Sequence, residues 1–198
     1  MMLAWRFPTA VGAGIEAQAQ SVELARRSLA CNDLESRCRV HHGDLRANAI
    51  MPGPFDLMTA TPPYFALGTA TTPADAQRFA CRSEVRGGVE SYCFAAALRL
   101  RPGGRLVLCM PGEKGGRVER AGREAGLVLE AGRPVIPREG RGPLFSLWSL
   151  LRQARAAEPA WLPPLVVRDR TGSWTPEMKA IRRGMGMPHE DANAGNGS

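Results

Sequence analysis

Histidine is scarce in this sequence, and its cysteines are not spaced in pairs. The 198 residues include only three histidines and five cysteines, an odd number. No Cys-x-x-Cys pair occurs among Cys31, Cys38, Cys81, Cys93 and Cys109. Because zinc sites and disulfide frameworks need paired spacing, we expect no metal and a reducing compartment, the cytoplasm.

Long apolar runs are also missing. No window approaches the roughly 20 apolar residues that a membrane-spanning helix needs. The first residues, Met1 to Arg6, lack the apolar run and cleavage site of a signal peptide. We therefore expect no membrane partner. The apolar fraction of 44% and the charged fraction of 23% are ordinary for one folded α/β domain.

Acidic residues are outnumbered, with 19 Asp and Glu against 26 Lys and Arg, for a net charge of +7. Arginine supplies most of the excess, and its planar donors suit phosphate groups. A basic surface favours a polyanionic partner, nucleic acid before membrane. An Arg-rich chain also follows from a GC-rich genome, so composition alone leaves the partner open.

Apolar segments with strand and helix periodicity alternate along the chain. We expect strands over 9–16, 39–44, 54–60, 105–110, 127–130 and 145–151, and helices over 18–32, 89–100 and 116–125. This alternation predicts an α/β fold with a mostly parallel, doubly wound sheet. We expect a single domain over 1–188 and a disordered tail over 189–198.

Two of these strands end on carboxylates. Ligands of open α/β sheets bind beyond the carboxyl ends of the strands. Glu16 is placed to accept hydrogen bonds from both hydroxyls of a ribose, and Asp44 from an adenine amino group. The ordinary alternatives are a solvated charge or helix-start acid for Glu16 and a turn or helix-capping residue for Asp44.

The strand over 54–60 runs into Thr61-Pro62-Pro63-Tyr64, here called the Pro-Pro-Tyr motif. Two consecutive prolines fix the backbone and leave carbonyls without competing amide donors. Such a carbonyl can accept a hydrogen bond from a substrate amine, while Tyr64 offers a face for stacking on an extruded base. The alternative is an ordinary Pro-Pro loop with a core aromatic residue.

The motif resembles the Asn-Pro-Pro-Tyr motif of class I, S-adenosylmethionine-dependent amino methyltransferases. These enzymes act on exocyclic amines of nucleobases or on glutamine side chains. Over roughly 11–184, the chain resembles the bacterial tRNA1(Val) adenine-37 N6-methyltransferase family. The residues that carry this resemblance are Phe65, Gly68, Arg78, Arg82, Glu84, Pro102-Gly103-Gly104-Arg105, Arg168-Asp169 and Thr175-Pro176-Glu177.

The resemblance implies a Rossmann-like methyltransferase with S-adenosyl-L-methionine as cofactor, and methyl transfer to N6 of an adenine in RNA, foremost tRNA. It implies Glu16, Asp44 and Thr61 as cofactor contacts and the Pro-Pro-Tyr motif as the catalytic segment. Phe65, Arg78 and Arg82 are the expected substrate contacts. Arg78, Arg82 and Arg86 would share one helical face towards phosphates, or form a solvated surface.

Two departures from the family affect the interpretation. The family's motif begins with Asn, Asp or Ser, whereas Thr61 is shorter than Asn and its methyl group crowds the site. The family also starts with a strand and a glycine-rich turn, whereas Met1 here falls inside the following helix. Gly12-Ala13-Gly14 is not that turn, because Glu16 follows at once.

We therefore expect a fold that lacks the first strand and the glycine-rich loop. A start codon assigned too late is favoured over a true truncation, because a sheet without that strand would expose unpaired edges. Two other functions stay open. One is methylation of N5 of a protein glutamine, and the other is RNA binding by a catalytically silent relative of the enzyme.

Overall fold

Strands and helices alternate along the chain, as the apolar pattern predicts. The computed structural model describes residues 1–47, 50–51, 53–65, 79, 81–153 and 158–188. The helices are α1 (Met2–Arg6), α2 (Ala19–Ala30), α4 (Val89–Arg99), the short η1 (Gly112–Lys114), α5 (Gly115–Glu124) and α6 (Pro176–Gly184). The strands are β1 (Gly12–Glu16), β2 (Cys38–His42), β3 (Phe55–Ala60), β4 (Leu100–Met110), β5 (Val128–Ile136), β6 (Phe145–Leu151), β7 (Ala160–Trp161) and β8 (Leu165–Val166).

The strands form two sheets. β1 and β2 pair in parallel, and the larger sheet has the order β3-β4-β6-β5-β7 with β8 beside β5. β3 and β4 are parallel, whereas β6 runs antiparallel to both β4 and β5. The prediction of an α/β fold is confirmed, and the expected parallel arrangement is interrupted only where β6 enters the larger sheet.

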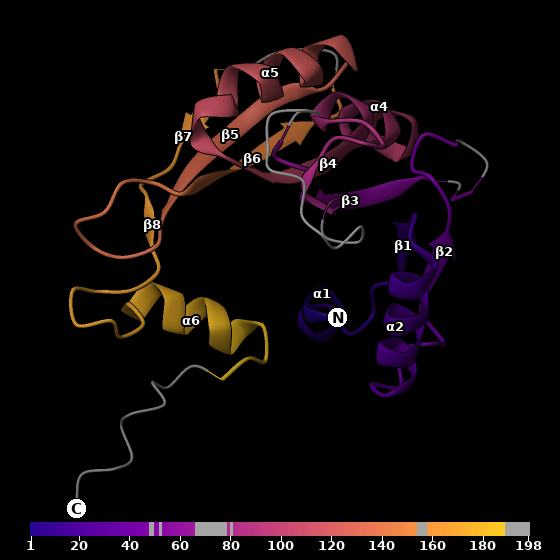
Figure 1. The fold of residues 1–198 in the computed structure, drawn as a ribbon, viewed down its shortest axis with the longest axis horizontal. Coiled ribbons are helices and arrows are strands. Elements are labelled where there is room, and N and C mark those ends of the chain that lie inside the picture. The colour runs from indigo at the N-terminus through magenta and orange to yellow at the C-terminus, as the bar shows by residue number, and fades with distance from the viewer. Residues whose placement is uncertain (48–49, 52, 66–78, 80, 154–157, 189–198) are drawn as a thin grey trace, which may run out of the picture.

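Helices α4 and α5 lie side by side over one face of the larger sheet (Figure 1). Every second residue of β4 points into this layer, so Leu106, Leu108 and Met110 are buried. They pack with Val89, Cys93 and Ala96 of α4, Val118 and Ala121 of α5, and Trp148 and Leu150 of β6. Burying each large apolar side chain contributes about 1.5–3 kcal/mol, so this layer holds α5 firmly over the carboxyl end of β4.

A buried arginine ties the connection between β2 and β3 to α4. Arg99 is 3% exposed, and its guanidinium donates to the carbonyls of Met51 (2.9 Å), Ala95 (2.9 Å) and Ala47 (3.1 Å). Charged groups are buried at low cost only when their donors are satisfied. Arg99 therefore fixes where the chain enters β3.

A cavity of about 910 Å³ separates the two sheets. Its lining includes Gly14 and Ile15 of β1, Met58 of β3, and Tyr92 and Ala95 of α4. Within the described residues, β1 pairs only with β2 and β3 only with β4, so the edges at the cavity have no strand partner. Figure 1 shows β1 and β2 apart from β3. The sequence predicts such unpaired edges.

Some element boundaries differ from the sequence-based expectation. The strand expected over 105–110 begins earlier, at Leu100, so Pro102-Gly103-Gly104 lies inside β4. There Gly103 N–H donates to Arg152 O (2.7 Å), and Gly104 O accepts from Arg152 N–H (2.9 Å). The backbone hydrogen bonds between β4 and the end of β6 therefore continue through these residues. Helix α6 was not expected, although Thr175 caps it by accepting from Met178 N–H and Pro176 begins it. The expected tail over 189–198 lies outside the described residues.

Candidate functional site

The Pro-Pro-Tyr motif lies directly beyond the carboxyl end of β3. Pro62 and Pro63 are buried, Thr61 is exposed and Tyr64 is half-buried. Within the described residues, no donor is bonded to the carbonyls of Thr61, Pro62 or Pro63. The prolines supply no amide donors of their own, so three consecutive acceptors are left without a partner among the described residues.

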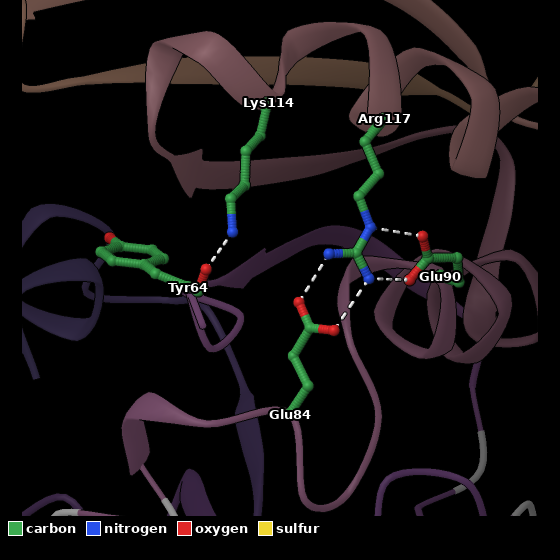
Figure 2. A network of polar contacts seen from close by, with 5 residues as sticks. All are labelled: Tyr64, Glu84, Glu90, Lys114 and Arg117. Atoms are coloured by element: carbon green, nitrogen blue, oxygen red, sulfur yellow. Dashed lines mark hydrogen bonds and ion pairs between the residues drawn. The ribbon is translucent and has the colours of Figure 1, made fainter. Parts of the chain in front are cut away.

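Tyr64 is anchored through its backbone and its side chain. The N–H groups of Tyr64 and Phe65 both donate to the carbonyl of Arg82, at 3.1 Å each. The ammonium of Lys114 donates to the Tyr64 carbonyl (Figure 2). The Tyr64 hydroxyl lies 3.6 Å from Cys109 Sγ. Burial, followed by the contact with Cys109, raises the pKa of Tyr64 to about 12, so the phenol is neutral at physiological pH.

Glu16 and Asp44 lie at the carboxyl ends of β1 and β2, as expected. Glu16 Oε1 accepts the N–H of Gln18 at 2.8 Å. Asp44 Oδ1 accepts from the N–H and Nε of Arg46, both at 2.9 Å, and Oδ2 accepts from its Nη2 at 2.6 Å. These bonds with Arg46 hold the pKa of Asp44 below its usual range. Both carboxylates are thus partly engaged in local turns.

Tyr92 of α4 is half-buried and lines the cavity between the sheets. Its pKa is raised, first by burial and then by the negative charges of Glu16 and Asp44. The donors and acceptors here fit the nucleoside half of a cofactor, with carboxylates for ribose and amino groups beside an aromatic ring. Gly12 and Gly14 lie within β1, as expected, and so do not form a glycine-rich turn. The roles of Glu16, Asp44 and Thr61 as cofactor contacts stay predictions.

An ion network joins α4, α5 and the segment before α4. Arg117 donates to Glu84 Oε1 (2.6 Å) and Oε2 (3.0 Å), and to Glu90 Oε1 (2.7 Å) and Oε2 (2.8 Å) (Figure 2). The Arg117 pKa is raised by these bonds, first by Glu90, and the Glu90 pKa is lowered. A Cβ at Gly88 would lie 2.4 Å from Arg117 Nη2, so glycine leaves room for the guanidinium.

The expected substrate contacts are only partly described. Phe65 is 43% exposed beside the motif, and the Arg82 side chain is exposed while its carbonyl holds Tyr64. Arg78 lies outside the described residues. Arg86 lies in a turn rather than in a helix with Arg82, so these two do not share one helical face. The substrate roles of Phe65, Arg78 and Arg82 stay predictions.

In the sequence, Lys114, Arg117, Arg120 and Arg123 repeat every three residues, which suits either a phosphate-facing or a solvated surface, and Cys109 has no assigned role. Lys114, Arg117 and Cys109 each reach the site from a distant part of the chain, on η1, α5 or β4. The three-residue spacing does not distinguish Lys114 and Arg117 from Arg120 and Arg123, because the contacts of the first two arise only when α5 packs over the sheet. The described residues contain no group of three or more His, Cys, Asp or Glu placed to hold a metal ion. No helix in the same part of the chain is long and apolar enough to cross a membrane.

The arrangement of strands and helices is the fold of class I methyltransferases. A predicted O-methyltransferase from Agrobacterium tumefaciens superposes with a TM-score of 0.68 at 22% identity, over 94% of this chain and 84% of that one. A methyltransferase from Pyrococcus furiosus superposes with a TM-score of 0.53 at 19% identity, over 77% of this chain and 68% of that one. The predicted fold class is thereby confirmed.

Sequence comparison identifies relatives within one group of methyltransferases. The tRNA1(Val) (adenine(37)-N6)-methyltransferase of Porphyromonas gingivalis is 28% identical over 183 residues, which are 89% of this chain and 71% of that protein. The protein of the same name from Tolumonas auensis is 27% identical over 167 residues, 84% of this chain and 68% of that protein. No family model matches the chain. The expected resemblance is confirmed, and methyl transfer is the type of reaction that fold and relatives support.

Proposed function

We propose that this chain transfers a methyl group from S-adenosylmethionine to the exocyclic N6 amino group of an adenine in RNA, with tRNA as the first substrate to test. The observation that carries the proposal is the Pro-Pro-Tyr motif at the end of β3, where three consecutive carbonyls have no donor among the described residues. Support for adenine and for RNA comes from the relatives, which are named as tRNA adenine-N6 methyltransferases.

The motif suits an amine as the reacting group. One N–H of the amine donates to a carbonyl of the Thr61-Pro62-Pro63 segment, and the other to the Thr61 hydroxyl. These bonds draw the nitrogen lone pair out of conjugation with the base and aim it outward. The bound cofactor supplies an electrophilic methyl group on its sulfonium. The amine nitrogen would take that methyl group as the sulfonium S–CH3 bond breaks, which leaves S-adenosylhomocysteine, and it would release one proton to solvent.

No strong base is required for this chemistry, and Tyr64 does not act as one. Its pKa of about 12 keeps it protonated, so its role is to present a ring face to the extruded adenine. Phe65, which is 43% exposed beside it, extends the same apolar surface. Of the two arginines proposed to contact the RNA backbone, Arg82 lies within the described residues, and its side chain is exposed.

Glu16 and Asp44 are the proposed holders of the cofactor's nucleoside. Glu16 Oε1 accepts one bond from Gln18, which leaves Oε2 for a ribose hydroxyl. Asp44 accepts three donors from Arg46, and a carboxylate has about four acceptor positions, so one position on Oδ2 remains for an amino group. We place this activity in the cytoplasm, in keeping with a tRNA substrate.

The test is methylation by the purified 198-residue chain, with radiolabelled S-adenosylmethionine and unmodified tRNA. We expect label in the RNA, recovered as N6-methyladenosine after digestion to nucleosides. Tyr64→Ala is expected to abolish the signal, while Arg123→Met, which changes an exposed residue of α5, should retain it.

Three outcomes would overturn the proposal. In a parallel reaction that offers a glutamine-containing protein, label in that protein and none in the RNA would favour the N5-glutamine alternative. Label recovered on cytosine or guanine would change the base. Failure to bind S-adenosylhomocysteine in calorimetry, with RNA binding retained, would identify a silent RNA-binding relative.

A further inference from the structure

We propose that Lys114 is a positioning residue that determines which carbonyls of the Pro-Pro-Tyr motif are open to a substrate amine. Lys114 ends η1 and immediately precedes α5, and its ammonium donates to the carbonyl of Tyr64. The proposal rests on the proposed function only for its effect on turnover. The positioning itself is a property of the folded chain and is testable without activity.

The contact divides four consecutive acceptors into two kinds. The carbonyls of Thr61, Pro62 and Pro63 have no donor among the described residues, whereas the Tyr64 carbonyl is bonded to a full positive charge. A charge-assisted hydrogen bond is stronger than a neutral one. A substrate amine must therefore compete with Lys114 for the Tyr64 carbonyl, whereas no such competitor among the described residues reaches the three upstream carbonyls.

The peptide plane that follows Tyr64 is held at both ends. Its carbonyl accepts from Lys114, and its N–H, which belongs to Phe65, donates to Arg82 O at 3.1 Å. The preceding plane is held through the Tyr64 N–H, which donates to the same Arg82 carbonyl. In a trans peptide the carbonyl points opposite to the N–H, so the Pro63 carbonyl is turned away from Arg82.

The start of α5 also holds the segment that carries the Arg82 carbonyl. Arg117 lies three residues after Lys114, which is about one helical turn, and it holds Glu84 through two hydrogen bonds of 2.6 and 3.0 Å. Glu84 follows Arg82 by two residues, and its N–H donates to Phe65 O at 2.9 Å. The positions of Lys114 and of the Arg82 carbonyl thus both depend on the start of α5.

Packing fixes the start of α5 against the sheet. A Cβ at Gly115 would lie 2.4 Å from Cη2 of Trp148, so the backbone beside Lys114 touches this buried ring. Val118 of α5 is fully buried in the same layer. The flexible stem of Lys114 therefore extends from an anchored backbone, which is what a positioning role requires.

The experiment compares Lys114→Met with Lys114→Arg and with the control Arg123→Met. Methionine keeps most of the apolar stem but removes the donor, and arginine restores a donor. Arg123 lies near the end of α5 with its side chain 71% exposed, and among the described residues its side chain approaches Glu119, at 3.9 Å. Amide hydrogen exchange at Tyr64 and Phe65 is the primary readout, with amides of β4 as the internal reference for intact folding.

We expect Lys114→Met to speed exchange at Phe65 at least tenfold while the β4 amides are unchanged. Lys114→Arg should recover part of the protection, and Arg123→Met should match the wild type. Unchanged exchange at Tyr64 and Phe65 in Lys114→Met would overturn the proposal, whether or not the chain is active. Equal acceleration at β4 would also overturn it, because the role would then be general stability.

Turnover supplies the second readout. Misplacement of a reacting group by about 1 Å can cost about a hundredfold in rate. We expect Lys114→Met to lower kcat between ten- and a hundredfold, with the KM for S-adenosylmethionine unchanged. A lower kcat with faster Phe65 exchange supports the proposal, and a raised cofactor KM with unchanged kcat contradicts it. A wild-type chain without turnover would refute the proposed function alone, because the exchange result still decides the role of Lys114.

Discussion

Replacing Arg117 by methionine should lower the free energy of unfolding by about 2–4 kcal/mol, and the structure shows where this loss arises. Removing one partner of a buried ion pair costs about 3–5 kcal/mol, because the other charge is left unpaired. The Glu84 side chain is only 12% exposed, so the cost of leaving it unpaired approaches that of a fully buried charge. The Arg117 side chain is 26% exposed, and this partial exposure lowers the expected cost. The Glu90 side chain is 37% exposed, so its bonds contribute no more than about 1 kcal/mol.

The pH dependence of this loss has a definite sign. The bonds from Arg117 hold the pKa of Glu90 below its ordinary value of 4.5. A carboxyl with a lowered folded pKa contributes stability above its unfolded pKa and loses that contribution as pH falls through the folded value. The Glu90 contribution to the difference in unfolding free energy between wild type and Arg117→Met, about 1 kcal/mol at most, should therefore be full at pH 7 and shrink below about pH 4.5.

Urea unfolding at pH 7 and at pH 3.5 measures both effects. Arg123→Met is the control, because its contact with Glu119 spans 3.9 Å between exposed side chains, and its unfolding free energy should stay within about 0.5 kcal/mol of wild type. A wild-type unfolding free energy in Arg117→Met at pH 7 would refute the reasoning. So would a loss of equal size at both pH values.

Four further substitutions test other features. Thr61→Asn, which supplies a longer side chain with a carbonyl acceptor, should raise kcat several-fold in the methylation assay. Gly122→Ala should lower the unfolding free energy by up to about 2 kcal/mol in urea, because a Cβ would lie 2.2 Å from Cδ2 of Leu150 and overpacking costs about 1–3 kcal/mol, more than the roughly 1 kcal/mol that alanine gains in a helix. Gly116→Ala, with nothing within 4 Å, should instead stabilise by up to about 1 kcal/mol. Arg99→Met should lower the unfolding free energy by about 3–5 kcal/mol, because three carbonyls lose their donor, and the melting temperature should fall accordingly.

Each of these has an outcome that would contradict it. A Thr61→Asn enzyme slower than wild type would show that the site is built around the hydroxyl. Equal stabilisation by Gly122→Ala and Gly116→Ala would mean that Leu150 moves aside without cost. An unchanged melting temperature in Arg99→Met would mean that water replaces the guanidinium.

Much of the fold follows from apolar periodicity. The strand expected over 145–151 coincides with β6, and the one over 54–60 with β3, because each is a compact apolar run between turn residues. Helix α6 was missed because it buries no side chain and so shows no apolar stripe, although its Thr-Pro start is a helix signal. The start of β4 was misplaced because Arg152, nearly 50 residues away, extends its ladder.

The candidate site was predictable where its residues are neighbours in sequence. The Pro-Pro-Tyr motif and Glu16 could be placed because each follows directly on an apolar strand. Lys114 and Arg117 could not be assigned, because Arg120 and Arg123 continue the same three-residue spacing yet are exposed to solvent. Only the packing of α5 distinguishes an inward-facing cation from an outward-facing one.

The cavity between the two sheets limits how cooperatively the molecule unfolds. In the described part of the chain, no ladder of backbone hydrogen bonds joins β1 to β3, so the coupling of the sheets depends on side chains around the cavity and on Arg99. Because the cavity of about 910 Å³ lies between those side chains, they make few contacts across it. The β1–β2 sheet can therefore open at a lower free energy than the larger sheet. Amides of β1 should exchange in an earlier phase than those of β4, and a single melting temperature then describes only part of the molecule.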